Sequence, residues 1–235
     1  MPRGRRSKTA GNAGSPTELQ KNRIIHTALK LFAKKGYAET SVDDIATDIG
    51  ATKGIVYHYF RSKHALLYEA RLAVQEPFLE ALRGVLAMTA PPDDKLREAI
   101  RSYVRILYSD PSIIRFNVDL NQFDAPLPPP NRRVIRKRRA EVVDAFKAVL
   151  TEGIAAGLFR QVDVSVIART IVGSIVWTAY WFDLNGRLGV DQLADQLVDF
   201  ALTSLLVSPP SAHAAGDGDG QLMPDASARL VSSRP

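Results

Sequence analysis

Apolar residues recur three or four positions apart along almost the whole chain, and no segment shows a convincing alternation of apolar and polar residues. The first spacing places side chains on one face of an α-helix, whereas alternation is typical of a half-buried strand. The fold is therefore predicted to be all-α, with about nine helices. They are expected at about residues 17–35, 41–49, 52–60, 62–87, 93–107, 110–122, 131–157, 163–184 and 191–207.

The chain divides by composition into four parts. Residues 1–15 are rich in arginine, glycine, serine and alanine, and residues 208–235 are rich in serine, proline, alanine, glycine and aspartate. Because neither segment offers much apolar surface to bury, we expect a disordered basic arm at one end and a disordered tail at the other. Residues 16–62 are predicted to form a first domain of three helices, and residues 63–207 a second helical domain.

The segment at residues 40–63, TSVDDIATDIGATKGIVYHYFRSK, has the pattern of a helix-turn-helix. Ser41 can cap the first helix, and Asp44 stands at the capping-box position three residues later. Gly50 follows the apolar stripe of this helix, where a sharp turn favours the residue that most easily adopts positive φ. Thr52 can then cap the second helix. The spacing therefore predicts two short helices joined by a tight turn.

The outer face of the second short helix suits a polyanion. Its residues are Lys53, Gly54, Tyr57 and His58. A lysine reaches a guanine edge or a phosphate, a glycine lets the backbone come close, and the two rings offer donors and apolar contact to a thymine methyl. No acidic residue lies between Asp48 and Glu69. An ordinary helical hairpin with a solvated basic rim fits the bare pattern as well.

The charge of the chain is concentrated around this segment. Residues 1–63 hold twelve lysines and arginines and five acidic residues, a net charge of +7, whereas the whole chain carries +6. Phosphate neutralisation supplies much of the affinity of nucleic-acid binding, so this distribution favours a DNA-binding function. A polybasic membrane anchor fits less well, because residues 1–15 have no acylation signal and no amphipathic apolar face.

The sequence predicts a cytoplasmic location and no membrane partner. The N-terminal basic residues are not followed by the apolar core of a secretory signal. The longest apolar run, residues 171–182, is interrupted by polar residues and is shorter than the roughly 20 residues that a membrane span needs.

Neither catalysis nor a cofactor is expected. The chain has no cysteine, which excludes disulfides, thiolate metal sites and a cysteine nucleophile. Its four histidines show no metal-ligand spacing. The sequence also lacks a G-x-S-x-G elbow, an H-E-x-x-H helix, a Walker loop and a G-x-G-x-x-G turn, so we expect that the protein is not an enzyme.

A second basic feature lies in the C-terminal part. Residues 132–139, RRVIRKRR, hold six cations in eight positions. Such a run could bind an acidic ligand head, such as that of a nucleotide-bearing thioester, or a second DNA segment. A run of this kind is also typical of a solvated helix face. The sequence leaves these interpretations open.

One dense pattern of residues is similar to that of a known family. It comprises residues 28–37 (ALKLFAKKGY), residues 40–42 and 44–46, and then Gly50, Lys53, Gly54, Tyr57, Tyr59, Phe60, Ser62, Lys63, Leu66 and Leu67. In these residues the chain resembles TetR-family transcriptional regulators. The resemblance is dense over residues 17–70, and further on it extends only to the helical layout.

This resemblance implies a homodimer held by the last two helices of each subunit, with two heads that read a pseudo-palindromic DNA operator. It implies base and groove contacts from Lys53, Gly54, Tyr57 and His58, and phosphate contacts from Thr40, Ser41, Thr52, Tyr59 and Lys63. Tyr57 stands where many relatives carry histidine. This departure affects the expected base preference more than the expected activity.

The resemblance also implies a repressor that is released from its operator by an unidentified small-molecule effector bound in the C-terminal part. Aromatic and apolar side chains suit the wall of such a pocket. The candidates are Tyr103, Leu107, Phe116, Phe123, Trp177, Tyr180 and Trp181. Any of them could instead be core or dimer interface. An alternative function is a helical ligand-binding or scaffold protein with a non-functional DNA head.

Overall fold

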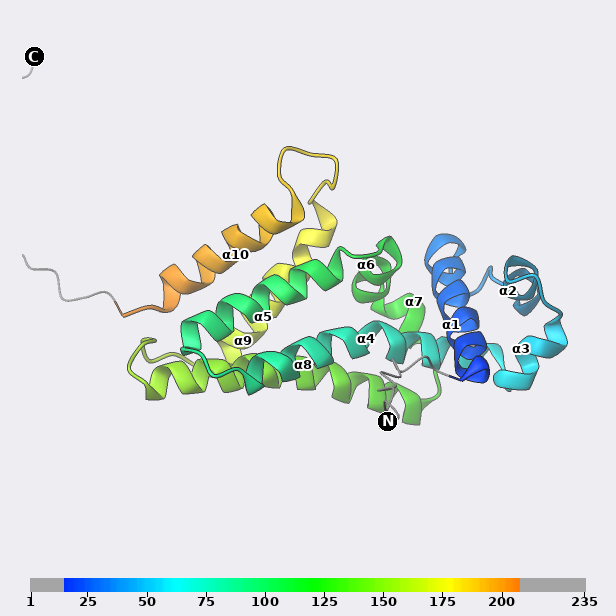
Figure 1. Ribbon diagram of the computed structural model, residues 1–235, viewed down its shortest axis with the longest axis horizontal. Helices are drawn as coiled ribbons and strands as arrows, with labels where there is room; N and C mark the ends of the chain where they lie inside the picture. Colours follow the sequence, from blue (N-terminus) through cyan, green and yellow to red (C-terminus); the bar gives the residue numbers. More distant parts are fainter. Residues whose placement is uncertain (1–14, 208–235) are drawn as a thin grey trace, which may run out of the picture.

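The computed structural model describes residues 15–207, which form ten α-helices, one short 3₁₀ helix and no strand (Figure 1). The prediction of an all-α fold is confirmed. The expected arm and tail lie outside this part of the chain, except for Ser15. The bounds are α1 Pro16–Lys35, α2 Val42–Asp48, α3 Lys53–Tyr59, α4 Lys63–Ala87, α5 Pro92–Leu107, α6 Pro111–Val118, α7 Leu120–Asp124, α8 Pro129–Ala155, α9 Val164–Trp177, η1 Thr178–Tyr180 and α10 Val190–Leu205.

Two expected helices are shorter than the sequence pattern suggested. The segment 110–122 is divided into α6 and α7, because the backbone of Asp119 leaves the helical region with φ −97° and ψ 63°. The Asp119 carboxylate then accepts the backbone N–H of Gln122 at 3.2 Å, which favours a new helix start. The helix expected over 163–184 ends at Trp177, and residues 183–189 contain aspartate, asparagine and two glycines that favour turns.

The first helix begins earlier than expected. Ser15 is its N-cap: the Ser15 hydroxyl accepts the backbone N–H of Glu18 at 3.2 Å, and the Glu18 carboxylate accepts the backbone N–H of Ser15 at 2.9 Å. Pro16 occupies the first helical position, where its missing N–H has no consequence. Ser15 and Glu18 thus form a capping box at the start of α1.

The molecule is elongated, with α1, α2 and α3 at one end (Figure 1). Helix α4 runs from this end into the body and packs along α8, while α5 packs against α10, and α9 against α8. We call the part formed by α1–α3 the head and the remaining helices the body. Its position at one end exposes α3 to any partner that approaches along the long axis.

Two hydrophobic cores stabilise the fold, and their border falls inside α4. Leu66, Leu67 and Ala70 in the first half of α4 belong to the core of the head, whereas Phe78 and Leu82 in its second half belong to the core of the body. Residues of α6, α7 and α8 also join the core of the head. The expected domain boundary at residues 62 and 63 therefore does not coincide with the border between the cores.

Candidate DNA interface and ligand cavity

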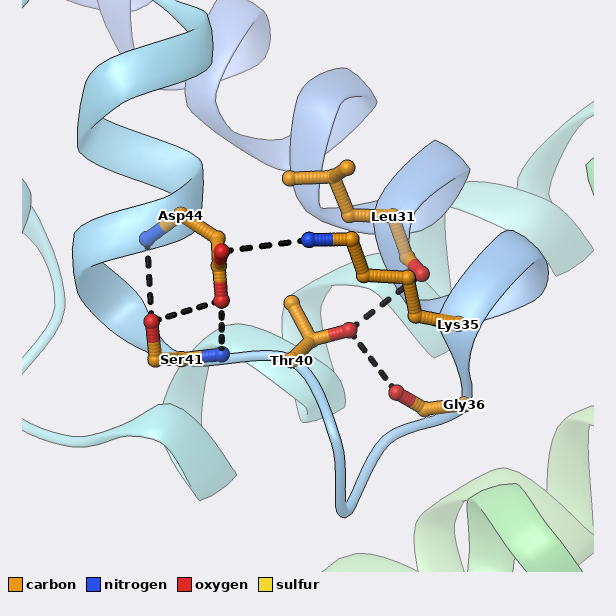
Figure 2. A network of polar contacts seen from close by, with 6 residues as sticks. All are labelled: Leu31, Lys35, Gly36, Thr40, Ser41 and Asp44. Atoms are coloured by element: carbon orange, nitrogen blue, oxygen red, sulfur yellow. Dashed lines mark hydrogen bonds and ion pairs between the residues drawn. The ribbon is translucent and has the colours of Figure 1, made fainter.

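The loop between α1 and α2 positions the helix-turn-helix through Thr40. The chain leaves α1 at Gly36, whose φ of 94° is rare for residues with a side chain. Thr40 is fully buried, and its hydroxyl lies 3.2 Å from the carbonyl oxygen of Leu31 and 2.8 Å from that of Gly36, to which it donates (Figure 2). This placement corrects the expected phosphate contact of Thr40, because its side chain points into the protein and its hydroxyl is already engaged.

The start of α2 has the predicted capping box. The Ser41 hydroxyl accepts the backbone N–H of Asp44 at 3.0 Å, and Asp44 Oδ2 accepts the backbone N–H of Ser41 at 2.7 Å and its hydroxyl at 2.6 Å (Figure 2). Lys35 Nζ lies 3.1 Å from Asp44 Oδ1. These bonds, first the one from the Ser41 hydroxyl, lower the pKa of Asp44 to about 2. Ser41 is exposed, but its hydroxyl proton is directed to Asp44.

The turn between α2 and α3 also follows the sequence pattern. Gly50 has a φ of 66°, in the left-handed region that favours glycine. Beyond it, Val56 and Phe60 are buried on the inner side of α3. Thr52 stands at the N-cap position, but its side chain makes no capping hydrogen bond and is exposed. Its hydroxyl is thus available to a partner.

The outer face of α3 is the exposed surface that the sequence predicted. Lys53, Gly54, Tyr57 and His58 are all exposed. Ile55 is also 40% exposed, which adds an apolar side chain to this face. Tyr59 is half-buried and packs edge-on against His58, with ring centroids 5.2 Å apart. The face therefore combines a cation, a glycine, two rings and a branched apolar group.

Two lysines of the predicted interface already have partners within the protein. Lys53 Nζ lies 2.7 Å from Asp43 Oδ2, and the hydrogen bond to this carboxylate raises the pKa of Lys53. Lys63 Nζ donates to the carbonyl oxygen of Ala38 at 3.0 Å and lies 4.3 Å from the ring centroid of Tyr37. Burial lowers the pKa of Lys63. Lys63 thus ties the start of α4 to the loop before α2.

The sequence pattern missed two polar residues of α1 that lie beside the outer face of α3. Gln20 and Arg23 line a shallow hollow of about 630 Å³ together with Thr52, Gly54 and His58. Gln20 and Arg23 are three residues apart and therefore share a side of α1. That spacing is a usable signal, but it gains meaning only once α1 is known to pack beside α3.

A second hollow lies among α4, α5, α6, α7, α8 and α9. It is a cavity of about 320 Å³, and we call it the body cavity. Its apolar wall consists of Phe78, Tyr103, Leu120, Val142, Val143, Val172 and Val176. Burial raises the pKa of Tyr103, so its phenol remains neutral. The size and wall of the cavity are typical of a small-molecule site.

Of the seven side chains expected around such a pocket, Tyr103 lines the body cavity. Leu107 is buried in the core of the body, and Phe116 and Phe123 stack on each other in the core of the head with centroids 4.0 Å apart. The other three aromatic residues lie at the surface. Trp177, Tyr180 and Trp181 are 62%, 61% and 57% exposed. Six of the seven thus lie outside the wall of the body cavity.

The basic run at residues 132–139 lies in the first half of α8 and does not form one uniform face. Arg133, Arg136 and Lys137 are exposed. Arg138 forms an ion pair with Glu76 of α4, and Arg139 pairs with Asp124 of α7 at 2.6 Å. Part of the run is thus solvated, and part connects α8 to its neighbours.

The chain matches two known family models. Residues 24–70 match the model of bacterial regulatory proteins of the tetR family, and residues 89–205 match that of a tetracyclin repressor-like C-terminal domain. PfmR from Thermus thermophilus, a TetR family regulator of known structure, is 31% identical to this chain, with a TM-score of 0.69. The match covers 77% of this chain and 97% of that one. The chain belongs to the TetR family of transcriptional regulators.

Two other relatives cover most of the chain. The HTH-type transcriptional repressor KstR2 of Mycolicibacterium smegmatis is 28% identical over 219 residues, which cover 87% of this chain and 100% of KstR2. AibR, whose structure was solved in complex with isovaleryl coenzyme A and operator DNA, is 28% identical with a TM-score of 0.68 and coverages of 77% and 97%. The similarity to TetR-family proteins thus includes both the head and the body.

In this TetR-family chain, α9 and α10 present an apolar outer surface. Val166 and Phe200 are 57% and 66% exposed. Beside Phe200 lies a groove of about 190 Å³, whose wall includes Ile171 and Leu197. Exposed apolar side chains next to an apolar groove are typical of a protein–protein interface.

Over the residues that the structure describes, neither a metal site nor a membrane-spanning helix is found. No group of three or more histidines and acidic residues within 15–207 has the arrangement of a metal site. In the same part of the chain, every helix is too short or too polar to cross a lipid bilayer.

Proposed function

We propose that this protein is a homodimeric repressor that binds a pseudo-palindromic operator and releases it when a small molecule fills the body cavity. One observation carries the proposal. The outer face of α3 is exposed at the end of the molecule, while Val56 and Phe60 hold the inner side of the same helix in the core. A helix held in this way is suited to lie in a major groove.

The contacts divide into base contacts and backbone contacts. Lys53, Gly54, Tyr57 and His58 form the part of the surface that enters the groove. Contacts to phosphates come from Thr52, Tyr59, Ser41 and Lys63 around this face, and we add Gln20 and Arg23 of α1, which line the same hollow. Thr40 is left out, because its side chain is buried.

The dimer uses the apolar surface of α9 and α10. In our proposal these two helices pack against the same helices of a second subunit, with Phe200 of one subunit beside the groove of the other. Two heads joined in this way bind half-sites about one helical turn apart, or about 34–36 Å. Since the proposed partner is operator DNA, we place the protein in the cytoplasm.

The effector site is the body cavity. Its wall includes α4, which continues into the core of the head, so a molecule that changes the position of α4 also changes the position of α3. AibR binds isovaleryl coenzyme A and operator DNA, which supports the assignment of a small-molecule effector to this chain as well.

The proposed function is tested by a gel-shift assay on the DNA upstream of the protein's own gene. Lys53→Ala and Tyr57→Ala should each weaken binding about tenfold, because each removes one groove contact. Lys147→Ala, the same charge change in the body, should leave the affinity unchanged. If the wild-type protein fails to shift this DNA at low salt, or if the two head variants bind like the wild type, the alternative of a scaffold with a non-functional head gains support.

A further inference from the structure

The charged residues that line the body cavity are both cations. Arg139 of α8 and Arg169 of α9 contribute to its wall, and no aspartate or glutamate does so. The other polar lining residues are Gln75, Tyr103 and Asn117, which are uncharged at neutral pH. The charged groups of the cavity wall are thus both cations and the rest of the wall is mostly apolar, a combination that favours an anion attached to an apolar body.

Two buried polar atoms beside the cavity lack partners within the described chain. Gln75 is only 5% exposed, and its Oε1 atom accepts no hydrogen bond. The Nη1 atom of Arg139 is also buried and donates none. Buried polar atoms are nearly always hydrogen-bonded, and each one left without a partner is unfavourable. A ligand that brings an acceptor to Arg139 Nη1 would satisfy the more costly of the two.

The other end of the Arg139 guanidinium is held in place. Its Nη2 atom lies 2.6 Å from Asp124 Oδ2, and Asp124 Oδ1 lies 2.9 Å from Nη2 of Arg71. The ion pair thus fixes the guanidinium through Nη2, while Nη1 has no hydrogen-bond partner within the described chain. A fixed donor loses little freedom when it binds a ligand, so its hydrogen bond contributes more to affinity and selectivity.

We propose that the body cavity binds a molecule with an apolar chain and an anionic head group, and that Arg139 holds this head. The proposal rests on the proposed function, since it identifies the chemical class of the effector. At about 320 Å³, the cavity is far larger than the roughly 30 Å³ of one water molecule. A medium-length acyl chain is accordingly a suitable probe, either as a free carboxylate or as a coenzyme A thioester with its phosphates.

The proposal is tested by calorimetric titration of the full-length protein, without DNA, with octanoate, octanoyl coenzyme A and the neutral octanamide. At least one anionic probe should bind about tenfold or more tightly than octanamide, as expected for a hydrogen bond to a charged group. Arg139→Gln should remove this preference, and Arg139→Lys should restore part of it. The matched control is Arg138→Gln, because Arg138 is the next residue of α8 but pairs with Glu76 and does not line the cavity.

The arms of this experiment separate the two sources of the anion. Octanoate binding that depends on Arg139 identifies a carboxylate head, and binding of octanoyl coenzyme A alone, again dependent on Arg139, identifies a phosphate-bearing head. Equal binding of octanamide, a preference retained by Arg139→Gln, or binding of neither anionic probe would overturn the proposal. Gel shifts of the same preparations report on operator binding separately. A protein that binds octanoate through Arg139 but shifts no DNA would contradict the proposed function and leave this inference intact.

Discussion

At the scale of single residues, the lysines of the predicted DNA interface already have partners within the protein. Lys53, central to the outer face of α3, is paired with Asp43 of α2 while both side chains remain at least half exposed. An exposed pair of this kind is weak and breaks easily when a phosphate approaches. Asp43 also places a negative charge close to the expected path of the DNA backbone. The Asp43 carboxylate is therefore expected to lower the affinity of the head for DNA.

Removal of this carboxylate should strengthen operator binding. We expect Asp43→Asn to raise the affinity about two- to fivefold at low salt, and the gain should shrink as salt increases, because it is electrostatic. Fluorescence anisotropy with labelled operator DNA measures both effects. Asp48→Asn makes the same charge change on α2 outside the Lys53 pair and should give a smaller gain. Equal gains from the two variants would mean that the affinity for DNA depends on the overall electrostatic potential of the head and not on the pair with Lys53.

At the scale of the elements, one buried cation connects α4 to two neighbouring helices. Arg71 is 1% exposed, pairs with Asp124 at 2.9 Å and donates to the carbonyl oxygen of Phe116 at 2.5 Å. Burial lowers the pKa of Arg71 to about 10, and the protein retains the charge at neutral pH. Arg71 thus joins α4 to both α6 and α7.

Loss of the Asp124 carboxylate should destabilise this junction. Asp124→Asn leaves Arg71 buried without its counter-charge, and we expect the free energy of unfolding to fall by about 3 kcal/mol. Urea unfolding followed by circular dichroism provides the measurement. Asp144→Asn is the matched control, since its pair with Lys147 is more exposed and should be worth at most about 1 kcal/mol. A change no larger than that of the control would show that Asp124 is not needed to hold Arg71.

The sequence predicted best what is decided locally. Ser41, Asp44 and Gly50 were placed correctly because a capping box and a positive φ depend on a few neighbouring residues. The burial of Thr40 was not predicted, because it depends on the carbonyl groups of α1. Six pocket candidates lie away from the body cavity, because aromatic and large aliphatic residues suit a core, a surface contact and a pocket alike. Arg139 was visible only as one cation in a run. Its pairing with Asp124 brings together elements that sequence spacing does not connect.

At the scale of the whole molecule, the head and the expected dimer surface play separate roles. The head stands at one end, and α9 and α10 lie in the body (Figure 1). These two helices carry apolar side chains at their surface. A dimer binds both half-sites of an operator at once, so the second head binds at a high effective concentration. Operator affinity should therefore depend on residues that do not touch DNA.

A charge introduced into the α10 surface should separate the subunits. Phe200→Asp places an ion where an apolar side chain is 66% exposed beside a groove, and we expect a monomer in size-exclusion chromatography with light scattering. Operator affinity should fall at least about tenfold with it. Met88→Asp, an exposed apolar residue after α4, serves as the control and should remain dimeric. A dimeric Phe200→Asp protein would place the interface elsewhere.

The border between the two cores has a consequence for attempts to exchange heads between relatives. A graft that is cut at residue 62 would separate α1–α3 from Leu66, Leu67 and Ala70, which complete their packing. A transplanted head also needs the matching surface formed by Phe116 and Phe123. DNA specificity in this protein is therefore not carried by a detachable module, and new specificities are better obtained by changing the outer face of α3 in place.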